Sequence, residues 1–246
     1  MVQKLEWESA FFKANCAQFY PDKIFEPNNL DEYDWVQGKC LINDELSKAI
    51  FGNNKFVFED TRVIFEKKLQ AEELPFHSNI EIERSSVDEI DPLSTIAKKE
   101  LTEHSRLLIL VGKEQTEKFY AEWVKKAVLG TFDDISFTIK MKEEPVGFIT
   151  LKYSNTEPKI GLIAIKRELQ GHSLGKKLIH FAENFLIEKN HKSLQVITEG
   201  RNIRAQQFYI KYGFNITNIE CWYYRMKKSV KDVNLAHSKF ENNKLY

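Results

Sequence analysis

This sequence has few cysteines, no long apolar run and no excess of either charge. Cys16, Cys40 and Cys221 lie far apart without a C-x-x-C pair, which argues against a zinc site or a disulfide framework and favours a reducing cytoplasm. The longest fully apolar run, Leu107 to Val111, is too short to span a bilayer. The N-terminus lacks the apolar segment of a signal peptide. We therefore expect a soluble, cytoplasmic protein.

The charges balance, because Lys and Arg number 36 and Asp and Glu also number 36. No overall field therefore draws the chain towards nucleic acid or an anionic membrane, and neither is expected as a partner. Hydrophobic residues make up 42% of the 246 positions, which is enough for a core in one large domain or two unequal ones. The histidines are scattered without ligand spacing, so we expect no metal.

Charges, a proline and a turn signal between residues 66 and 83 indicate the end of one unit and the start of another. We place the boundary near residue 77, giving an N-terminal unit (1–77), a larger unit (78–228) and a C-terminal tail (229–246). In the first unit a helix over 41–51 precedes strands in KFVFE and RVIFEKK. The same order recurs in RAQQFYIKY, GFNIT and CWYYRMK, so the first unit is predicted to be a truncated copy of the tail of the second.

The larger unit begins with a strand near 80–83 and helices near 91–101 and 116–129. Strands follow in SFTIKMK, PVGFITLKYS and KIGLIAI, and their short connections predict an antiparallel meander. Apolar residues recur every three or four positions from Ser173 to Lys189, which predicts a helix, and SLQVITE predicts another strand. The expected class is mixed α+β, with one central sheet flanked by helices.

A polar loop, QGHSLG from Gln170 to Gly175, joins a predicted strand to that helix. Small residues at a helix N-terminus let backbone N–H groups point outwards, and the helix dipole favours an anion, so the loop suits phosphate. An ordinary strand-to-helix turn is the alternative for the loop taken alone.

A second motif, NIRAQQFYIKYGF, runs from Asn202 to Phe214. Asn202 and Tyr209 are seven residues apart, so on a helix they share a face about 10 Å apart along its axis and suit an extended thiol arm. In the alternative, Asn202 only caps the helix and Tyr209 is a core aromatic.

Both motifs resemble those of the GNAT superfamily of acyl-CoA-dependent N-acyltransferases. The loop is similar to the family's Q/R-x-x-G-x-G/A pattern, with Ser173 at the middle glycine, and the second motif has every marked residue of N-x-x-A-x-x-x-Y-x-x-x-G-F. The stretches WESAFF, KFYAEWVKKAVLGTFDD, KIGLIAI and CWYYR further resemble the TDP-fucosamine acetyltransferase family. That family N-acetylates a dTDP-4-amino-4,6-dideoxyhexose for surface polysaccharides. The resemblance implies a GNAT fold preceded by a small truncated GNAT-like unit.

The resemblance also implies direct attack of the sugar amine on acetyl-CoA without a metal. Tyr209 would protonate the departing thiolate, and a backbone amide near Ile163 to Ile165 would stabilise the oxyanion. The loop would hold the CoA phosphates and Asn202 the pantetheine arm. The predicted CoA-binding residues are Ile163, Ala164, Ile165, Gln170, Gly171, His172, Ser173, Leu174, Gly175, Lys176, Asn202 and Tyr209.

On the acceptor side, HSRLL occupies the place where GNAT enzymes present acceptor-binding side chains. Arg106 is predicted to pair with the diphosphate, with Ser105 beside it, and a surface arginine is the alternative. No general base is evident. Glu199 could serve through water or be a solvated loop residue.

Other functions stay open at this point. The chain could acetylate a protein or another small amine, could use a longer acyl-CoA, or could be a non-catalytic CoA-binding module. The sugar epimer, the position of the amine and the nucleotide base are undetermined by the sequence. A homodimer is a further expectation, because exposed sheet edges in this fold often pair.

Overall fold

The computed structural model describes residues 1–21, 30–70, 80–154 and 156–227. The strands are β1 (Val2–Lys4), β2 (Cys16–Phe19), β3 (Trp35–Leu41), β4 (Val57–Lys68), β5 (Ile80–Arg84), β6 (Ile135–Met141), β7 (Glu144–Lys152), β8 (Lys159–Ile165), β9 (Ser193–Glu199) and β10 (Asn215–Met226). The helices are α1 (Glu6–Phe12), α2 (Glu45–Asn53), α3 (Ile90–Leu101), α4 (Leu107–Val128), α5 (Leu174–Glu188) and α6 (Ile203–Lys211). Single 3-10 turns are η1 (Leu30–Glu32), η2 (Val87–Glu89), η3 (Thr102–His104) and η4 (Arg167–Leu169).

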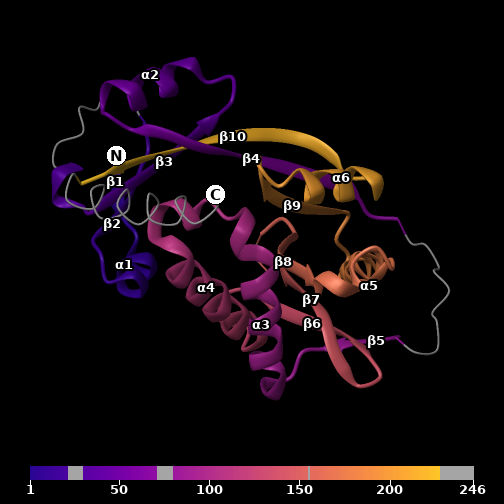
Figure 1. Cartoon of the computed structure of the whole chain (residues 1–246). Coiled ribbons are helices and arrows are strands. Elements are labelled where there is room, and N and C mark those ends of the chain that lie inside the picture. Colours follow the sequence, from indigo (N-terminus) through magenta and orange to yellow (C-terminus); the bar gives the residue numbers. More distant parts are fainter. Residues whose placement is uncertain (22–29, 71–79, 155, 228–246) are drawn as a thin grey trace, which may run out of the picture.

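One ten-stranded sheet runs through the described residues in the order β1-β2-β3-β10-β4-β9-β8-β7-β6-β5. The β2–β3 and β8–β9 pairs are parallel and the other neighbours are antiparallel. Helices cover the sheet, as Figure 1 shows. The predicted α+β class, a mostly antiparallel central sheet flanked by helices, is confirmed. Among the described helices, none is long and apolar enough to cross a bilayer.

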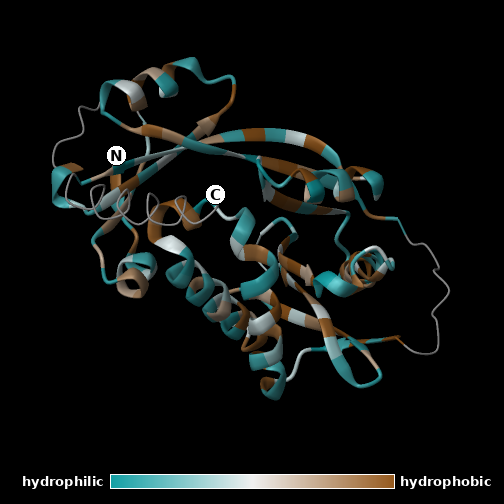
Figure 2. Cartoon of the chain, in the orientation of Figure 1, coloured by the Kyte–Doolittle hydropathy of each residue, from teal (hydrophilic) through white to brown (hydrophobic). Residues whose placement is uncertain are grey.

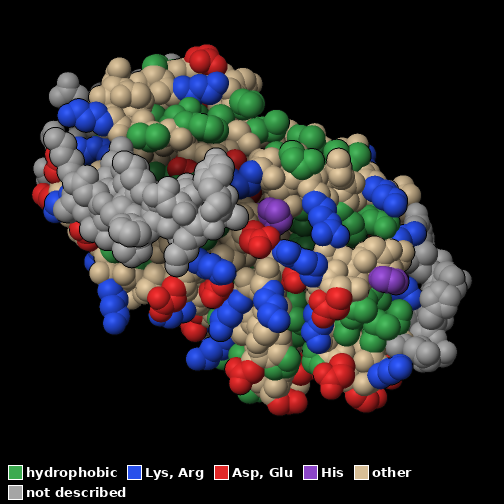
Figure 3. All heavy atoms as spheres, viewed as in Figure 1, with side chains coloured by type: hydrophobic (Ala, Val, Ile, Leu, Met, Phe, Trp, Pro, Cys, Tyr) green, Lys and Arg blue, Asp and Glu red, His purple; other side chains and the backbone are tan. Residues whose placement is uncertain are grey.

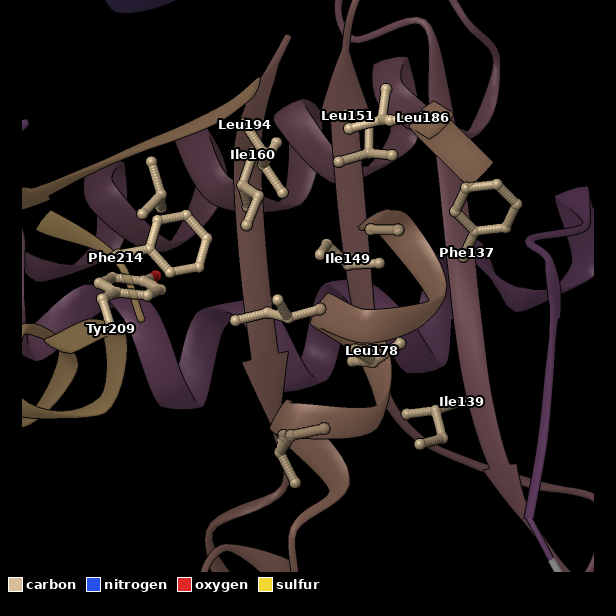
Figure 4. Close-up of a cluster of buried hydrophobic side chains, with 14 of the residues drawn as sticks. Phe137, Ile139, Ile149, Leu151, Ile160, Leu178, Leu186, Leu194, Tyr209 and Phe214 are labelled. Atoms are coloured by element: carbon tan, nitrogen blue, oxygen red, sulfur yellow. The ribbon is translucent and has the colours of Figure 1, made fainter. Parts of the chain in front are cut away.

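Helices on the two faces of the sheet cover separate cores, because successive residues of a strand point to opposite faces. On β7, Phe148 packs in the core under α3 and α4, whereas Ile149 packs in the core under α5 and α6. Figure 4 shows part of the second core, with Leu178 and Leu186 of α5 facing Ile149 and Leu151 of β7. In Figure 2 the strands carry alternating brown and pale or teal bands, which is the same alternation seen as hydropathy.

Three predicted elements differ from the structure. The end of KFVFE, from Val57, and RVIFEKK lie on the single strand β4. The end of GFNIT, from Asn215, and CWYYRM lie on the single strand β10, because β4 and β10 pair with each other from Val57 to Glu66. This pairing joins each pair of segments into one strand, and register shifts between Ile216 and Asn218 and between Trp222 and Tyr223 absorb its irregularities. The helix predicted from residue 116 begins at Leu107, with a break at Gly112, whose φ of 78° is outside the helical range.

The boundary predicted near residue 77 and the tail 229–246 lie outside the described residues. Within the described residues, β4 from the N-terminal part of the chain lies between β9 and β10. Arg62 to Lys68 of β4 pair with Glu199 to Ser193 of β9. The N-terminal segment and the later part of the chain therefore contribute to the same sheet.

Candidate functional site

The sheet opens between β8 and β9. The two strands pair only at Lys159 with Gln195 and at Ile160 with Val196, and then they diverge. On its other edge, β8 pairs with β7 with a register shift between Ile149 and Leu151. Such a bulge bends a strand and re-aims its residues. Beyond Ile160 the edge of β8 is therefore left without a paired strand among the described residues.

A buried network holds the bulge in place. Asp133 accepts hydrogen bonds from Trp123 Nε1 at 2.8 Å and from Thr150 Oγ1 at 2.6 Å. Thr150 Oγ1 in turn accepts from the Leu162 N–H at 2.8 Å. Gly161 lies against this network, and a Cβ there would be 2.1 Å from Asp133 Oδ2. The position consequently has no room for a side chain, and the backbone of β8 is fixed by side chains rather than by a regular ladder.

The free edge of β8 presents backbone donors to the opening. The Lys166 N–H donates to Val146 O of β7 at 2.9 Å, and backbone groups of an antiparallel strand alternate between its two edges. The N–H groups of Ile163 and Ile165 therefore point away from β7. Gln170 Nε2 donates to Ile165 O at 2.7 Å, which ties the polar loop to this edge.

A cavity of about 510 Å³ lies at this edge, between β8, the polar loop, α6 and the end of α3. It brings together most of the predicted CoA-binding residues: Ile163, Ala164, Ile165, Gln170, Gly171, Ser173, Leu174, Gly175, Lys176, Asn202 and Tyr209. His172 is not among the residues lining it; its ring nitrogen Nδ1 lies 3.3 Å from Leu169 O.

The polar loop turns through two left-handed residues, Gly171 at φ 87° and Ser173 at φ 62°. Helix α5 begins directly afterwards, and the Lys177 N–H donates to Ser173 O at 3.1 Å. The N–H groups before Lys177 in the first turn have no acceptor within the helix. At Gly175 a Cβ would be 3.0 Å from Phe208 Cζ, so glycine lets α5 approach α6 closely.

The left-handed backbone at Ser173 predicts a gain in stability from glycine. Ser173→Gly should raise the free energy of unfolding by roughly 0.5–1 kcal/mol, because a residue with a Cβ is strained in this conformation. Gly171→Ala should lower it by about 1 kcal/mol for the converse reason. Urea titration of both variants measures the effect, and a Ser173→Gly protein less stable than the wild type would contradict it.

Tyr209 and Asn202 each have a structural contact as well as a place in the cavity lining. The Tyr209 ring lies 5.6 Å from that of Phe65. It lies 5.7 Å from that of Phe214, which is beside it in Figure 4. Burial raises the pKa of the Tyr209 phenol above its ordinary value. Asn202 Oδ1 accepts from the Ala205 N–H at 3.1 Å and so caps α6. The cap and the packing that the sequence offered as alternatives are both present, and both residues also line the cavity.

Three cavity residues on α6, absent from the sequence prediction, share one face of the helix. They are Arg204, Phe208 and Lys211, spaced at four and three residues, which is the helical period. At 3.6 residues per turn this face lies roughly opposite the one shared by Asn202 and Tyr209, so the spacing of the two motif residues does not predict it. Lys176 and Arg167 add further positive charge to the lining, and Figure 3 shows lysine and arginine side chains over this face of the molecule.

The predicted acceptor residues form a separate buried cluster. Arg106 donates from Nη1 to Glu199 Oε1 at 2.6 Å and from Nε to the Tyr224 hydroxyl at 2.7 Å. Its guanidinium carbon lies 4.2 Å from the centre of the Trp222 ring. Ser105 is buried beside it and accepts from the Leu107 N–H at 3.2 Å. Arg106 is therefore not a surface arginine, and Glu199, with a side chain 13% exposed, is not a solvated carboxylate.

The cluster and the cavity lie on either side of the α3–α4 junction. His104 lines the cavity, whereas Arg106, two residues later, belongs to the cluster. The β9–α6 connection also joins the two sites, because the N–H of the cavity residue Asn202 donates to the backbone oxygen of the cluster residue Glu199 at 3.0 Å. No group of His, Cys, Asp or Glu side chains in the described part of the chain is arranged to hold a metal ion.

Comparison with known proteins gives one family model and one curated relative. Residues 107–223 match the family model of the GNAT acetyltransferase domain. The dTDP-fucosamine acetyltransferase of Escherichia coli O6:H1 is 24% identical over 91% of this chain and 97% of its own length.

Solved structures share the fold at low identity. A GCN5-related N-acetyltransferase from Sphaerobacter thermophilus aligns with a TM-score of 0.52 and 12% identity over 78% of this chain and 60% of that one. The PaiA N-acetyltransferase of Thermoplasma acidophilum, in complex with coenzyme A, aligns with a TM-score of 0.50 and 18% identity over 60% of this chain and 98% of that one.

Proposed function

We propose that this chain, which carries a GNAT acetyltransferase domain and is an acyl-CoA-dependent N-acetyltransferase, acetylates the amine of a dTDP-linked 4-amino-4,6-dideoxyhexose. The observation that supports this acceptor most directly is the likeness to dTDP-fucosamine acetyltransferase along nearly the whole of both chains. The product would enter surface polysaccharide synthesis from the cytoplasm. The arrangement of the cavity and the buried cluster is consistent with two substrates that meet from opposite sides.

Acetyl-CoA would occupy the cavity at the free edge of β8. The first-turn N–H groups of α5 would receive its phosphates, as the free amides and the dipole of a helix N-terminus favour. The pantetheine arm would then run along β8 towards Asn202. The N–H of Ile163 or Ile165, both facing the opening, would donate to the thioester oxygen.

The chemistry follows from this placement. The neutral sugar amine attacks the thioester carbonyl, a C–N bond forms, and the carbonyl oxygen becomes an oxyanion that the β8 amide stabilises. The C–S bond then breaks, and the Tyr209 hydroxyl gives its proton to the thiolate; the phenolate regains a proton from water after CoA leaves. The excess proton of the amine leaves to water, for which Glu199 would act as the relay. No covalent intermediate with the protein is needed.

Thiol release tests the acceptor. The purified protein is given acetyl-CoA with dTDP-4-amino-4,6-dideoxyglucose, its galactose epimer, or peptide amines, and free thiol is measured. Turnover with one sugar nucleotide and none with peptides is the expected result, and it identifies the epimer. Turnover with peptides alone would show that the acceptor is a protein amine and not a sugar nucleotide. CoA binding without any turnover would indicate a non-catalytic module or a different acyl donor.

The basic residues of the cavity predict an effect on the donor alone. Arg204→Gln combined with Lys211→Gln should raise the KM for acetyl-CoA by about threefold to tenfold, because two charge-assisted contacts to phosphate are lost. The KM for the acceptor should stay the same. Lys192→Gln, an exposed lysine outside the cavity lining, is the control. An unchanged KM for acetyl-CoA in the double variant would show that neither residue contributes to binding of the donor.

A further inference from the structure

The buried cluster contains a second arginine that lacks a partner for part of its guanidinium group. The guanidinium carbon of Arg62, on β4, lies 5.2 Å from the centre of the Trp222 ring. That of Arg106 lies 4.2 Å from the same ring centre. Its Nε is buried without a hydrogen-bond partner. Two guanidinium groups therefore lie beside one indole. Trp222 itself is only 5% exposed, so it can support the arginines but cannot stack on a nucleotide base.

The register of the sheet explains how Arg62 reaches this position. Arg62 pairs directly with Glu199 of β9 on one side and with Glu220 of β10 on the other. Each carboxylate already has a cation, since Glu199 binds Arg106 at 2.6 Å and Glu220 binds Lys39 at 2.6 Å. No ion pair within 4.0 Å joins Arg62 to a described carboxylate.

The cluster thus contains two guanidinium groups, Arg62 and Arg106, of which only Arg106 has an ion pair, with Glu199; Glu220 pairs with Lys39, whose side chain is 43% exposed. Burial lowers the pKa of Arg62, and the charge of Arg106 lowers it further. A buried charge without full compensation is costly to the folded protein. An anion that binds beside both arginines would offset that cost.

We propose that Arg62 and Arg106 together bind the diphosphate of the acceptor, so that a residue of the N-terminal segment selects a nucleotide-linked sugar. Arginine presents a planar set of donors that matches phosphate oxygens. A diphosphate has enough oxygens for both guanidinium groups. Glu199 pairs with Arg106 only, so the charge of Arg62 has no ion-pair partner among the described residues. The inference rests on the proposed sugar-nucleotide acceptor, and it adds Arg62, from a strand outside the 107–223 family match.

Glu199 offers the acceptor a hydrogen-bond acceptor beside the two arginines. Its Oε1 binds Arg106, whereas its Oε2 is buried without a hydrogen-bond partner. Because Arg62 and Glu199 are cross-strand neighbours, one free donor and one free acceptor lie on the same side of the sheet. The acceptor carries both an anionic diphosphate and an amine, so the two groups are complementary to it.

Binding of phosphate ligands to the CoA-saturated protein tests the inference. Excess CoA fills the cavity, so a titrated anion reports on the second site. We expect dTDP and inorganic pyrophosphate each to bind at least about tenfold more weakly to Arg62→Gln than to the wild type, as loss of a charge-assisted contact predicts. Arg62→Lys, which keeps the charge but loses the planar donors, should fall between them. Arg225→Gln removes an arginine of the same sheet that pairs with Asp31, and it should bind like the wild type.

Stability separates a ligand-binding role from a structural one. Without ligand, Arg62→Gln should melt at the same temperature as the wild type or higher, because it removes an uncompensated charge. Affinity unchanged in Arg62→Gln, with or without a fall in melting temperature, would overturn the inference. Acetylation of the sugar nucleotide with an unchanged acceptor KM in this variant would overturn it while the proposed function stands. Arg62-dependent binding of pyrophosphate without turnover of any sugar nucleotide would support the anion site and reject the proposed acceptor.

Discussion

Replacing Tyr209 with phenylalanine is expected to lower kcat by roughly a hundredfold or more, the usual contribution of a positioned general acid. The KM for acetyl-CoA should change little. The ring would keep its contacts with Phe65 and Phe214, so the melting temperature should also change little. Steady-state kinetics with thiol detection measures kcat and the KM for acetyl-CoA, and a thermal melt measures the melting temperature.

The pH profile of the wild type adds an independent check. Burial raises the pKa of Tyr209, so its proton is retained up to and beyond pH 10, the ordinary pKa of tyrosine. An alkaline fall in kcat below about pH 10 should therefore not arise from this residue. Tyr153→Phe, which alters a tyrosine packed against Phe185 and His191, is the matched control and should retain full activity. Equal kcat values for Tyr209→Phe and the control would show that another group protonates the thiolate.

Gly161→Ala is expected to cost about 1–3 kcal/mol of the free energy of unfolding, as overpacking of a buried site does. The new Cβ would be 2.1 Å from Asp133 Oδ2 and 2.7 Å from Thr150 Oγ1. Relief of these overlaps must move either the buried network or β8 itself. Because the network fixes the Leu162 N–H, the neighbouring Ile163 N–H should shift too, and kcat should fall along with stability.

Gly52→Ala is the matched control for that substitution. Gly52 lies in α2, and a Cβ there would meet no atom within 4 Å. Alanine is the better helix former, so this variant should be more stable by roughly 0.5–1 kcal/mol and fully active. Chemical unfolding and kcat are measured for both proteins. A Gly161→Ala protein as stable and as active as the wild type would mean that the bulge does not set the geometry of β8.

Several features were predictable from the sequence because they depend on residues close together in the chain. The polar loop from Gln170 to Gly175 does precede a helix, and the spacing of Asn202 and Tyr209 does bring both to one cavity. Helical periodicity and hydrophobic alternation likewise gave the α+β class. Local patterns have this power because φ and ψ preferences and the 3.6-residue period act within a few residues.

The sequence left the long-range pairings undetermined. The merger of two predicted strands into β4 and of two into β10 depends on their pairing with each other, from Val57 to Glu66 against Tyr224 to Asn215. The start of α4 at Leu107 depends on packing, since Leu107 and Leu110 are buried against Trp35 and Trp222.

The sequence by itself therefore determined the class of fold, the polar loop before α5 and the helix that carries Tyr209 with Asn202 at its start. Only the tertiary structure decided that β8 and β9 diverge after Ile160 and that Arg62 lies beside Glu199. Those positions are set by strand register between segments far apart in the sequence, 36 residues for Ile160 with Val196 and 137 for Arg62 with Glu199, for which a single sequence contains no local signal. The cavity follows from the divergence of β8 and β9. The cluster of Arg62 and Arg106 follows from the pairing of β4 with β9 and β10.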